Sequence, residues 1–234
     1  MLMVNLPTHR GHGSIEIIYG CMFSGKSKTA YDRCLNRETF SDERWVGFKS
    51  PVDTRAGKDY PMHIKLHPPN DKGVLMFVPA VVINNMEDAF DYLSDNRRIS
   101  FVWFDEGQFI GAREKRAHTS VMLTLKEHGY GVVGAYLDET FNGDDFPLSG
   151  DEHTSDVIAI ADVPTHNHAI CQHRIETGSM CRKPAIHSQR FNPDGSLAKP
   201  EDPILVVGEE RHDENFVSFY EARCNEDWIN PRSL

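Results

Sequence analysis

The sequence predicts an α/β fold, with a largely parallel sheet flanked by helices and a small C-terminal unit after it. Three observations lead to this prediction. Short β-rich runs alternate with helical stretches up to about Pro164, a glycine-rich phosphate-binding sequence separates the first strand from the first helix, and histidines, cysteines, prolines and glycines cluster after that point. We therefore expect a nucleotide-binding domain over residues 14–163 and a small second domain over residues 164–234.

The expected strands are short runs rich in β-branched and aromatic residues. They cover residues 14–19, 45–49, 99–104 and 131–137, and a further β-rich run covers residues 74–83. The run ISFVWF at residues 99–104 is the clearest of these, because an unbroken apolar run bounded by polar residues is typical of a buried strand.

The expected helices lie between these strands and cover residues 26–36, 86–93 and 113–128. Residues 50–73 are rich in Pro, Asp, Lys and His and have no periodicity, which predicts a long loop. In the C-terminal unit we expect a polar loop and then a β-run at residues 203–207. This unit has too little apolar periodicity to be held together by burial alone, so we expect it to need a staple.

Composition and charge exclude several classes of protein. The chain has 234 residues, of which 39% are hydrophobic and 26% charged, as in soluble globular proteins. A net charge of −10 argues against a general electrostatic grip on extended nucleic acid or an anionic membrane. No apolar stretch approaches the roughly 20 residues that span a bilayer, and the N-terminus has no run of signal-peptide length. We expect a cytoplasmic protein whose 5 cysteines stay reduced.

Residues 20–27 read GCMFSGKS, a full match to the phosphate-binding loop (P-loop) pattern, with a strand expected before it and a helix after it. The glycines let backbone N–H groups turn toward phosphate oxygens, and the helix N-terminus adds partial positive charge. We assign Gly20, Ser24, Gly25, Lys26 and Ser27 to an ATP site, with Lys26 reaching the β- and γ-phosphates and Ser27 binding Mg²⁺. The alternative is a chance turn before an ordinary helix.

Two acidic residues follow the clearest strand. Asp105 and Glu106 come directly after ISFVWF, at the end of a strand expected to neighbour the phosphate loop. Asp105 can hold the hydration shell of Mg²⁺, and Glu106 can act as general base on a substrate hydroxyl within hydrogen-bond reach. The alternative is a solvated pair of acids at a strand end.

The motifs together resemble a known family. GCMFSGKS, DTR at residues 53–55, DEGQF at residues 105–109 and LDETF at residues 137–141 occur in the order and approximate spacing of the zinc-containing, tetrameric, cytosolic (type II) thymidine kinases. The resemblance covers roughly residues 15–227 and includes a cysteine-bearing C-terminal region. It implies a P-loop kinase domain with a small zinc-binding and lasso domain, ATP and Mg²⁺ as cofactors, a structural Zn²⁺, and a homotetramer.

The resemblance also implies roles for individual residues. Glu106 matches the catalytic base that takes the proton from the sugar 5′-hydroxyl, and Arg55 matches an arginine beside the transferring phosphoryl group. Residues matching the wall of the pyrimidine pocket, and one matching a loop over the nucleoside, are Met22, Phe109, Phe141, Phe146 and, in the loop, Tyr220. The alternatives are that Phe141 and Phe146 are plain core aromatics and that Tyr220 is a surface residue.

The cysteines depart from the family pattern, in which two close pairs of ligands, usually of C-x-x-C spacing, hold the zinc. Here Cys171 is followed by Cys181 after an apparent insertion, and Asp227 stands three residues after Cys224. Zn²⁺ accepts imidazole and carboxylate as well as sulfur, so His173 and Asp227 are candidates for the fourth ligand, with His187 and His212 left open. The alternative is a decayed site with ordinary reduced cysteines. We expect Cys21 and Cys34, which lie in the nucleotide domain, to be structural.

His168 stands where the resemblance places a small hydroxyl residue near the thymine 5-methyl group. An imidazole there either turns out as a surface histidine or reshapes the pocket for a polar 5-substituent. We therefore expect thymidine phosphorylation to dTMP in deoxynucleoside salvage. A kinase for another 5-substituted pyrimidine deoxynucleoside is one alternative, and a P-loop ATPase acting on nucleic acid, disfavoured by the charge of −10, is another. A catalytically silent zinc-containing regulator is a third, which the intact Lys26, Asp105 and Glu106 argue against.

Overall fold

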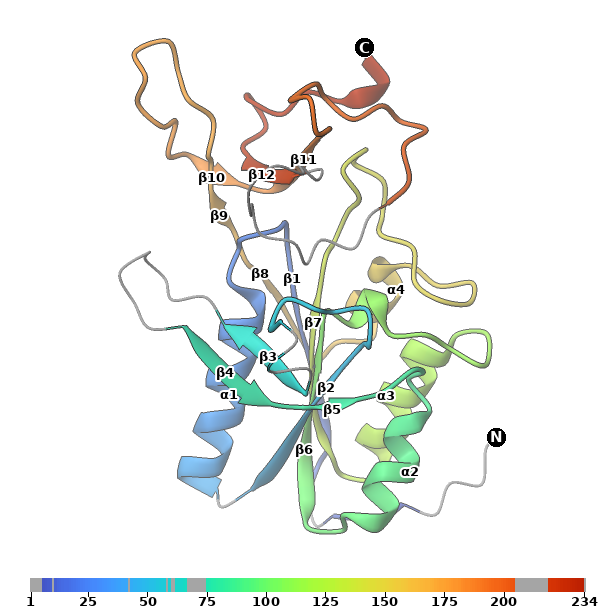
Figure 1. Ribbon diagram of the computed structural model, residues 1–234. Helices are drawn as coiled ribbons and strands as arrows, with labels where there is room; N and C mark the ends of the chain where they lie inside the picture. The colour runs from blue at the N-terminus through green and yellow to red at the C-terminus, as the bar shows by residue number, and fades with distance from the viewer. Residues whose placement is uncertain are drawn as a thin grey trace.

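A six-stranded parallel sheet forms the centre of the protein, with strand order β5-β2-β6-β7-β1-β8. The computed structural model describes residues 6–9, 11–41, 43–57, 59, 62–66, 75–204 and 219–233. The strands of the sheet are β1 (Ser14–Tyr19), β2 (Arg44–Lys49), β5 (Val81–Val82), β6 (Ile99–Asp105), β7 (Gly131–Tyr136) and β8 (Val163–His166). Together with its flanking helices, this sheet confirms the predicted α/β fold of P-loop type (Figure 1).

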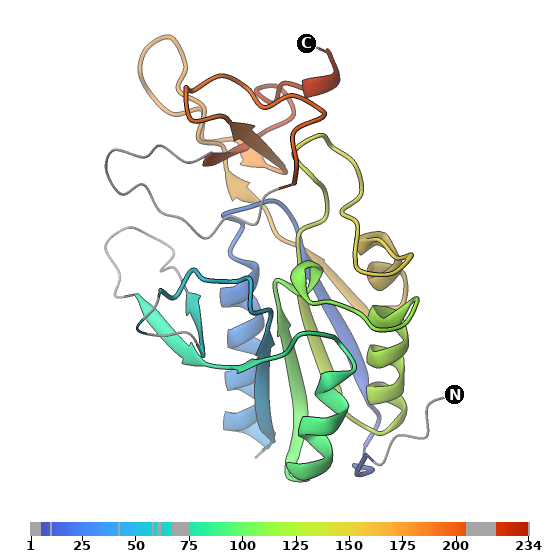
Figure 2. The ribbon, with the colours of Figure 1, turned by 45° about the vertical axis from the view of Figure 1, so that its right-hand side comes forward.

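Helices cover both faces of the sheet. On one face lies α1 (Lys26–Ser41), and on the other lie α2 (Asp88–Asp95), α3 (Ala117–Glu127) and α4 (Thr154–Ala159) (Figures 1 and 2). Alternate residues of β6 serve the two faces, because side chains in a strand alternate in direction. Phe101 and Trp103 pack with the α1 side, whereas Val102 and Phe104 pack with the core beneath α2 and α3.

The expected long loop over residues 50–73 contains a strand. β3 (His63–Leu66) pairs antiparallel with β4 (Met76–Pro79), and this hairpin adds Ile64, Leu66 and Val78 to the core on the α1 side. The expected β-run at residues 74–83 is therefore divided between β4 and the edge strand β5. The prediction of a long loop was wrong at residues 63–66, because a four-residue strand with polar neighbours carries almost no periodicity.

The C-terminal unit consists of two small antiparallel sheets above the carboxyl edge of the main sheet (Figure 2). One pairs β9 (Ala169–Ile170) with β10 (Pro184–Ala185), and the other pairs β11 (His187–Phe191) with β12 (Phe219–Arg223). The expected boundary at residue 163 falls on the first residue of β8, which belongs to the main sheet, and the division into two domains stays a prediction. The expected β-run at 203–207 lies largely outside the described residues.

Two short 3-10 turns complete the fold, Gly107–Phe109 directly after β6 and Pro231–Ser233 near the C-terminus. Among the residues that the structure describes, no helix has both the length and the apolar character needed to cross a bilayer.

Candidate active site

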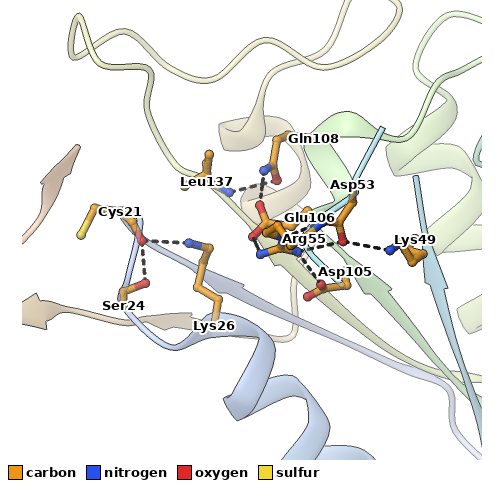
Figure 3. A network of polar contacts seen from close by, with 10 residues as sticks. All are labelled: Cys21, Ser24, Lys26, Lys49, Asp53, Arg55, Asp105, Glu106, Gln108 and Leu137. Carbon is orange, nitrogen blue, oxygen red and sulfur yellow. Dashed lines mark hydrogen bonds and ion pairs between the residues drawn. The ribbon is translucent and has the colours of Figure 1, made fainter. Parts of the chain in front are cut away.

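The phosphate loop joins β1 to the N-terminus of α1 and has the backbone that its glycines allow. Gly20 has a φ of 143°, and a Cβ there would lie 2.1 Å from the carbonyl oxygen of Asn167, so only glycine fits. Gly25 has a φ of 79°, which is also costly for a residue with a Cβ. The Lys26 ammonium donates to the Cys21 carbonyl at 2.8 Å, as does the Ser24 hydroxyl (Figure 3). The loop therefore presents a folded cradle whose lysine is held across it.

The guanidinium of Arg55 gathers three carboxylates at the carboxyl ends of β2 and β6 (Figure 3). Its Nε lies 2.7 Å from Asp53 Oδ1, its Nη2 lies 3.1 Å from Asp105 Oδ2, and its Nη1 lies 2.8 Å from Glu106 Oε1. Behind this group, the buried Lys49 ammonium lies 3.4 Å from Asp53 Oδ2. The carboxyl ends of parallel strands meet at one edge, which is why residues so distant in the chain converge here.

Asp105 is fully buried, and burial raises its pKa to about 7, with the Arg55 charge opposing the rise and the Glu106 and Asp53 carboxylates adding to it. Its Oδ1 atom accepts no hydrogen bond from the described residues. The Ser27 hydroxyl faces this carboxylate and favours its ionised form. A buried carboxylate oxygen without a partner, next to a hydroxyl, suits a hard divalent cation such as Mg²⁺. The residues present therefore fit the metal that a triphosphate would bring.

The aromatic residues expected in the pyrimidine pocket make two kinds of contact, one between two rings and one between a ring and a guanidinium group. Phe109 and Phe146 meet edge to face with ring centroids 5.8 Å apart. Phe141 is buried, with the guanidinium carbon of Arg190 5.2 Å from its ring centroid. Tyr220, on β12, stands opposite Arg190 in the β11–β12 register. These rings can therefore both pack in the core and line a pocket.

Met22 and Cys21 of the phosphate loop are held by the C-terminal unit. The Met22 N–H donates to Ser188 Oγ at 3.0 Å, and the Cys21 thiol donates to the Ala185 carbonyl at 3.3 Å. Cys21 also packs in one buried cluster with Cys171 and Cys224. The C-terminal unit thus contacts the loop that would hold the phosphates.

His168 is exposed, and its ring packs edge-on against that of His166 at 4.5 Å between centroids. His166 in turn stacks on Tyr19 at 4.7 Å and lies 3.3 Å from an Asp138 carboxylate oxygen. This placement agrees with the first of the two alternatives, a surface histidine among neighbouring histidines.

Four potential metal ligands converge in the C-terminal unit. The sulfur atoms of Cys171, Cys181 and Cys224 and a carboxylate oxygen of Asp227 all lie within 4.8 Å of one another. The Cys181 and Cys224 sulfurs are 3.9 Å apart, and Asp227 Oδ2 lies 3.3 Å from Cys171 Sγ and 3.2 Å from Cys224 Sγ. Tetrahedral Zn²⁺ would require about 3.8 Å between sulfurs and about 3.5 Å between sulfur and oxygen. The cluster can therefore hold zinc.

The wide spacing between the first two cysteines is absorbed by a hairpin. An Arg174–Met180 bridge closes it, and the Cys181 N–H donates to the His173 carbonyl at 2.8 Å, so that the chain returns to its starting point. This hairpin spans the wide interval between Cys171 and Cys181 and brings Cys181 back beside Cys171.

The other candidate ligands have different partners. The His173 ring is hydrogen-bonded to the Arg223 guanidinium, and the His187 ring to Glu139 and Asn225. His212 lies outside the described residues. The structure therefore favours Asp227 over His173 as the fourth ligand.

Several site residues have at most a weak signal in the sequence. They are Lys49, Gln108, Leu137, Ser188 and Arg190, each defined by a contact across the fold. Lys49 had a weak signal, since a lysine that ends an apolar strand run is buried with that run. Gln108 lay inside the DEGQF motif without a role.

Comparison with protein families agrees with this geometry. A family model described as thymidine kinase matches residues 13–228, which include the phosphate loop, the Arg55 cluster and all four potential zinc ligands. This match covers most of the chain and confirms the resemblance carried by the motifs. The chain belongs to the thymidine kinase family.

Proposed function

We propose that this thymidine kinase moves the γ-phosphate of ATP to the 5′-hydroxyl of thymidine with Glu106 as the general base. The observation that carries the proposal is the Arg55 fork, which ties Glu106 to Asp105 at the strand ends beside the phosphate loop. Each Glu106 oxygen already accepts one hydrogen bond, from Arg55 or from Gln108, and each carboxylate oxygen can accept a second. A substrate hydroxyl can therefore donate its proton to a carboxylate that is already oriented.

Phosphoryl transfer requires mainly that the 5′-oxygen be aligned with the γ-phosphorus and that charge on the transferring group be neutralised. In this proposal Lys26 leaves the Cys21 carbonyl to bind the β- and γ-phosphates, and Arg55 offsets charge on the transferring group. Ser27 and Asp105 would hold Mg²⁺, which when bound neutralises charge on the β- and γ-phosphates. Gly20, Ser24 and Gly25 supply the turn that brings backbone N–H groups toward the phosphates.

The nucleoside base would lie against Met22, Phe109, Phe141 and Phe146, whose apolar surfaces suit a pyrimidine ring, with Tyr220 over it. Because His168 is exposed beside His166, thymidine is the favoured substrate over a nucleoside with a polar 5-substituent.

A panel of nucleosides with ATP and Mg²⁺, assayed for the monophosphate product, tests the proposal. We expect the highest kcat/KM for thymidine, with deoxyuridine and 5-hydroxymethyl-deoxyuridine lower. Preference for the 5-hydroxymethyl substrate would support the alternative in which His168 shapes the base pocket. ATP hydrolysis without any nucleoside, stimulated by DNA, would instead indicate a P-loop ATPase and overturn the kinase assignment.

We further propose that Cys171, Cys181, Cys224 and Asp227 bind one structural Zn²⁺. Purified protein should contain about one zinc per chain, because structural sites bind zinc tightly. The Cys181→Ser variant should lose most of this metal, measured by elemental analysis. The matched control is Cys34→Ser, since Cys34 is a buried cysteine in the α1-side core and outside the cluster. Less than about a tenth of an equivalent in the unaltered protein would contradict the assignment.

The remaining proposals rest on the family resemblance and on charge. We propose a homotetramer in the cytoplasm, without extended nucleic acid or a membrane as partner, in keeping with the net charge of −10. Light scattering of the purified protein would measure the oligomeric state.

A further inference from the structure

We infer that Gln108 is a positioning residue, which fixes the Glu106 carboxylate to the carboxyl end of β7. The inference rests on the proposed role of Glu106 as base and deepens it. Gln108 lies in the short turn after β6, two residues beyond Glu106, and its side chain is 4% exposed.

Both ends of the Gln108 amide are used, and each by a different element (Figure 3). Its Nε2 donates to Glu106 Oε2 at 2.5 Å, and its Oε1 accepts the Leu137 N–H at 3.1 Å. An amide that donates at one end and accepts at the other transmits the position of one partner to the other, because its plane is rigid. The Glu106 carboxylate is thereby held by an amide that is anchored directly after the end of β7, a strand of the main sheet.

Leu137 is itself a fixed point. It follows directly after β7, and its carbonyl accepts a buried hydrogen bond from Thr154 Oγ1 at 2.8 Å. Its N–H and its carbonyl are therefore both engaged, by Gln108 and by Thr154. Leu137 also opens the LDETF segment that carries Phe141. The Gln108 amide thus links the proposed base to the segment that carries one wall of the proposed pocket.

The backbone of the turn is built to allow this contact. Glu106 has a φ of 46°, a left-handed conformation that non-glycine residues rarely adopt. At Gly107 a Cβ would lie 2.3 Å from the Tyr136 ring, so the turn can press against β7 only with glycine there. This close approach brings the Gln108 side chain back toward Glu106 and Leu137.

Arg55 alone does not define the orientation of the base. It donates to Oε1 of Glu106, from a segment after β2, and it also serves Asp53 and Asp105. Gln108 donates to the other oxygen, Oε2. Two donors, one on each oxygen, fix the carboxylate plane, and alignment within a fraction of an ångström governs rate in a transfer reaction.

Two substitutions test the hydrogen bond that the amide donates to Glu106. Gln108→Met removes both hydrogen bonds at similar volume, and Gln108→Glu keeps an acceptor for Leu137 while replacing the donor to Glu106 with a second carboxylate. We expect both to lower kcat for thymidine by about 10- to 100-fold, the effect of losing a hydrogen bond to a charged group, with KM for thymidine and ATP changed less than about threefold. Steady-state kinetics measures both parameters.

The matched control is Gln189→Met. Gln189 is another buried glutamine, and its side chain bridges the backbone of Ile229 through both ends, at 3.2 Å and 2.8 Å. This control should lower the Tm as Gln108→Met does, but leave kcat within about twofold of the unaltered enzyme, since no catalytic group depends on it.

A double-variant cycle with Glu106→Gln closes the test. If Gln108 acts through Glu106, adding Gln108→Met to Glu106→Gln should change kcat less than about threefold. If Gln108→Met lowers kcat equally in the parent and in Glu106→Gln, the positioning role alone is overturned. The same holds if Gln108→Met has a normal kcat while Glu106→Gln has a strongly lowered one. A Glu106→Gln enzyme with normal kcat would overturn the proposed base, and the inference with it.

Discussion

The Glu106→Gln variant should phosphorylate thymidine with a kcat lowered by about 10²- to 10⁴-fold, the usual contribution of a general base. The amide is nearly isosteric and can keep one hydrogen bond to the surroundings, but it cannot accept a proton from the 5′-hydroxyl. KM for thymidine and for ATP should change less than about threefold, because other residues bind the pyrimidine ring and the phosphates. Initial-rate kinetics with both substrates varied measures the three parameters.

Isothermal titration of the same variant with thymidine and with ATP provides the control, since preserved affinities separate a lost chemical step from a damaged site. Near-normal turnover of Glu106→Gln would show that another group, or solvent, takes the proton.

Replacing Arg55 with methionine should have a second large effect, on both rate and stability. Three carboxylates would lose their shared cation, and breaking a buried ion pair by removing one partner costs about 3–5 kcal/mol of unfolding free energy. The kcat should fall by about 10³-fold, as when an arginine beside a transferring phosphoryl group is removed. Arg55→Lys should recover part of the stability but little of the rate, because an ammonium lacks the planar fork.

The difference in unfolding free energy between the parent and Arg55→Met should shrink as the pH falls. Burial alone would raise the pKa of Asp53, but hydrogen bonds and charge from Arg55, with Lys49 behind, hold it below its ordinary value of 3.8. A lowered carboxyl pKa contributes stability that is fully present above the ordinary value and is lost as the pH falls through the lowered one. Denaturant unfolding of the parent and of Arg55→Met should therefore converge as the pH is taken below about 4. A gap that stayed constant or widened would contradict this account of Asp53.

The parts of the fold that the sequence predicts are those with strong local patterns. The strand–GCMFSGKS–helix order and the ISFVWF run correspond to β1, α1 and β6, because central parallel strands are buried on both faces and read as apolar runs. β8 gave no such signal. Among the described residues it is an edge strand that pairs with β1 alone, most of its residues are exposed, and it contains a proline. The six-residue helix α4 is equally short of periodicity.

At the site, too, the sequence predicts what is local and misses what depends on contacts between distant residues. Asp105, Glu106, Arg55 and the cysteines could be selected from the sequence by residue type and motif. The choice between Asp227 and His173 depends on how a hairpin folds back and on an Arg223 contact, neither of which is local in sequence. The Gln108–Leu137 bond likewise joins residues 29 positions apart and leaves no pattern along the chain.

The contacts of Cys21 and Met22 with the C-terminal unit have a practical consequence for the lifetime of the enzyme. Two hydrogen bonds, one of them from the buried Cys21 thiol, join the phosphate loop to β10 and β11, in the unit that a bound metal would stabilise. Loss of the metal would weaken ATP binding, while the main sheet, which has its own core, stays folded. Ageing or heated preparations are therefore expected to become inactive first and to melt only later.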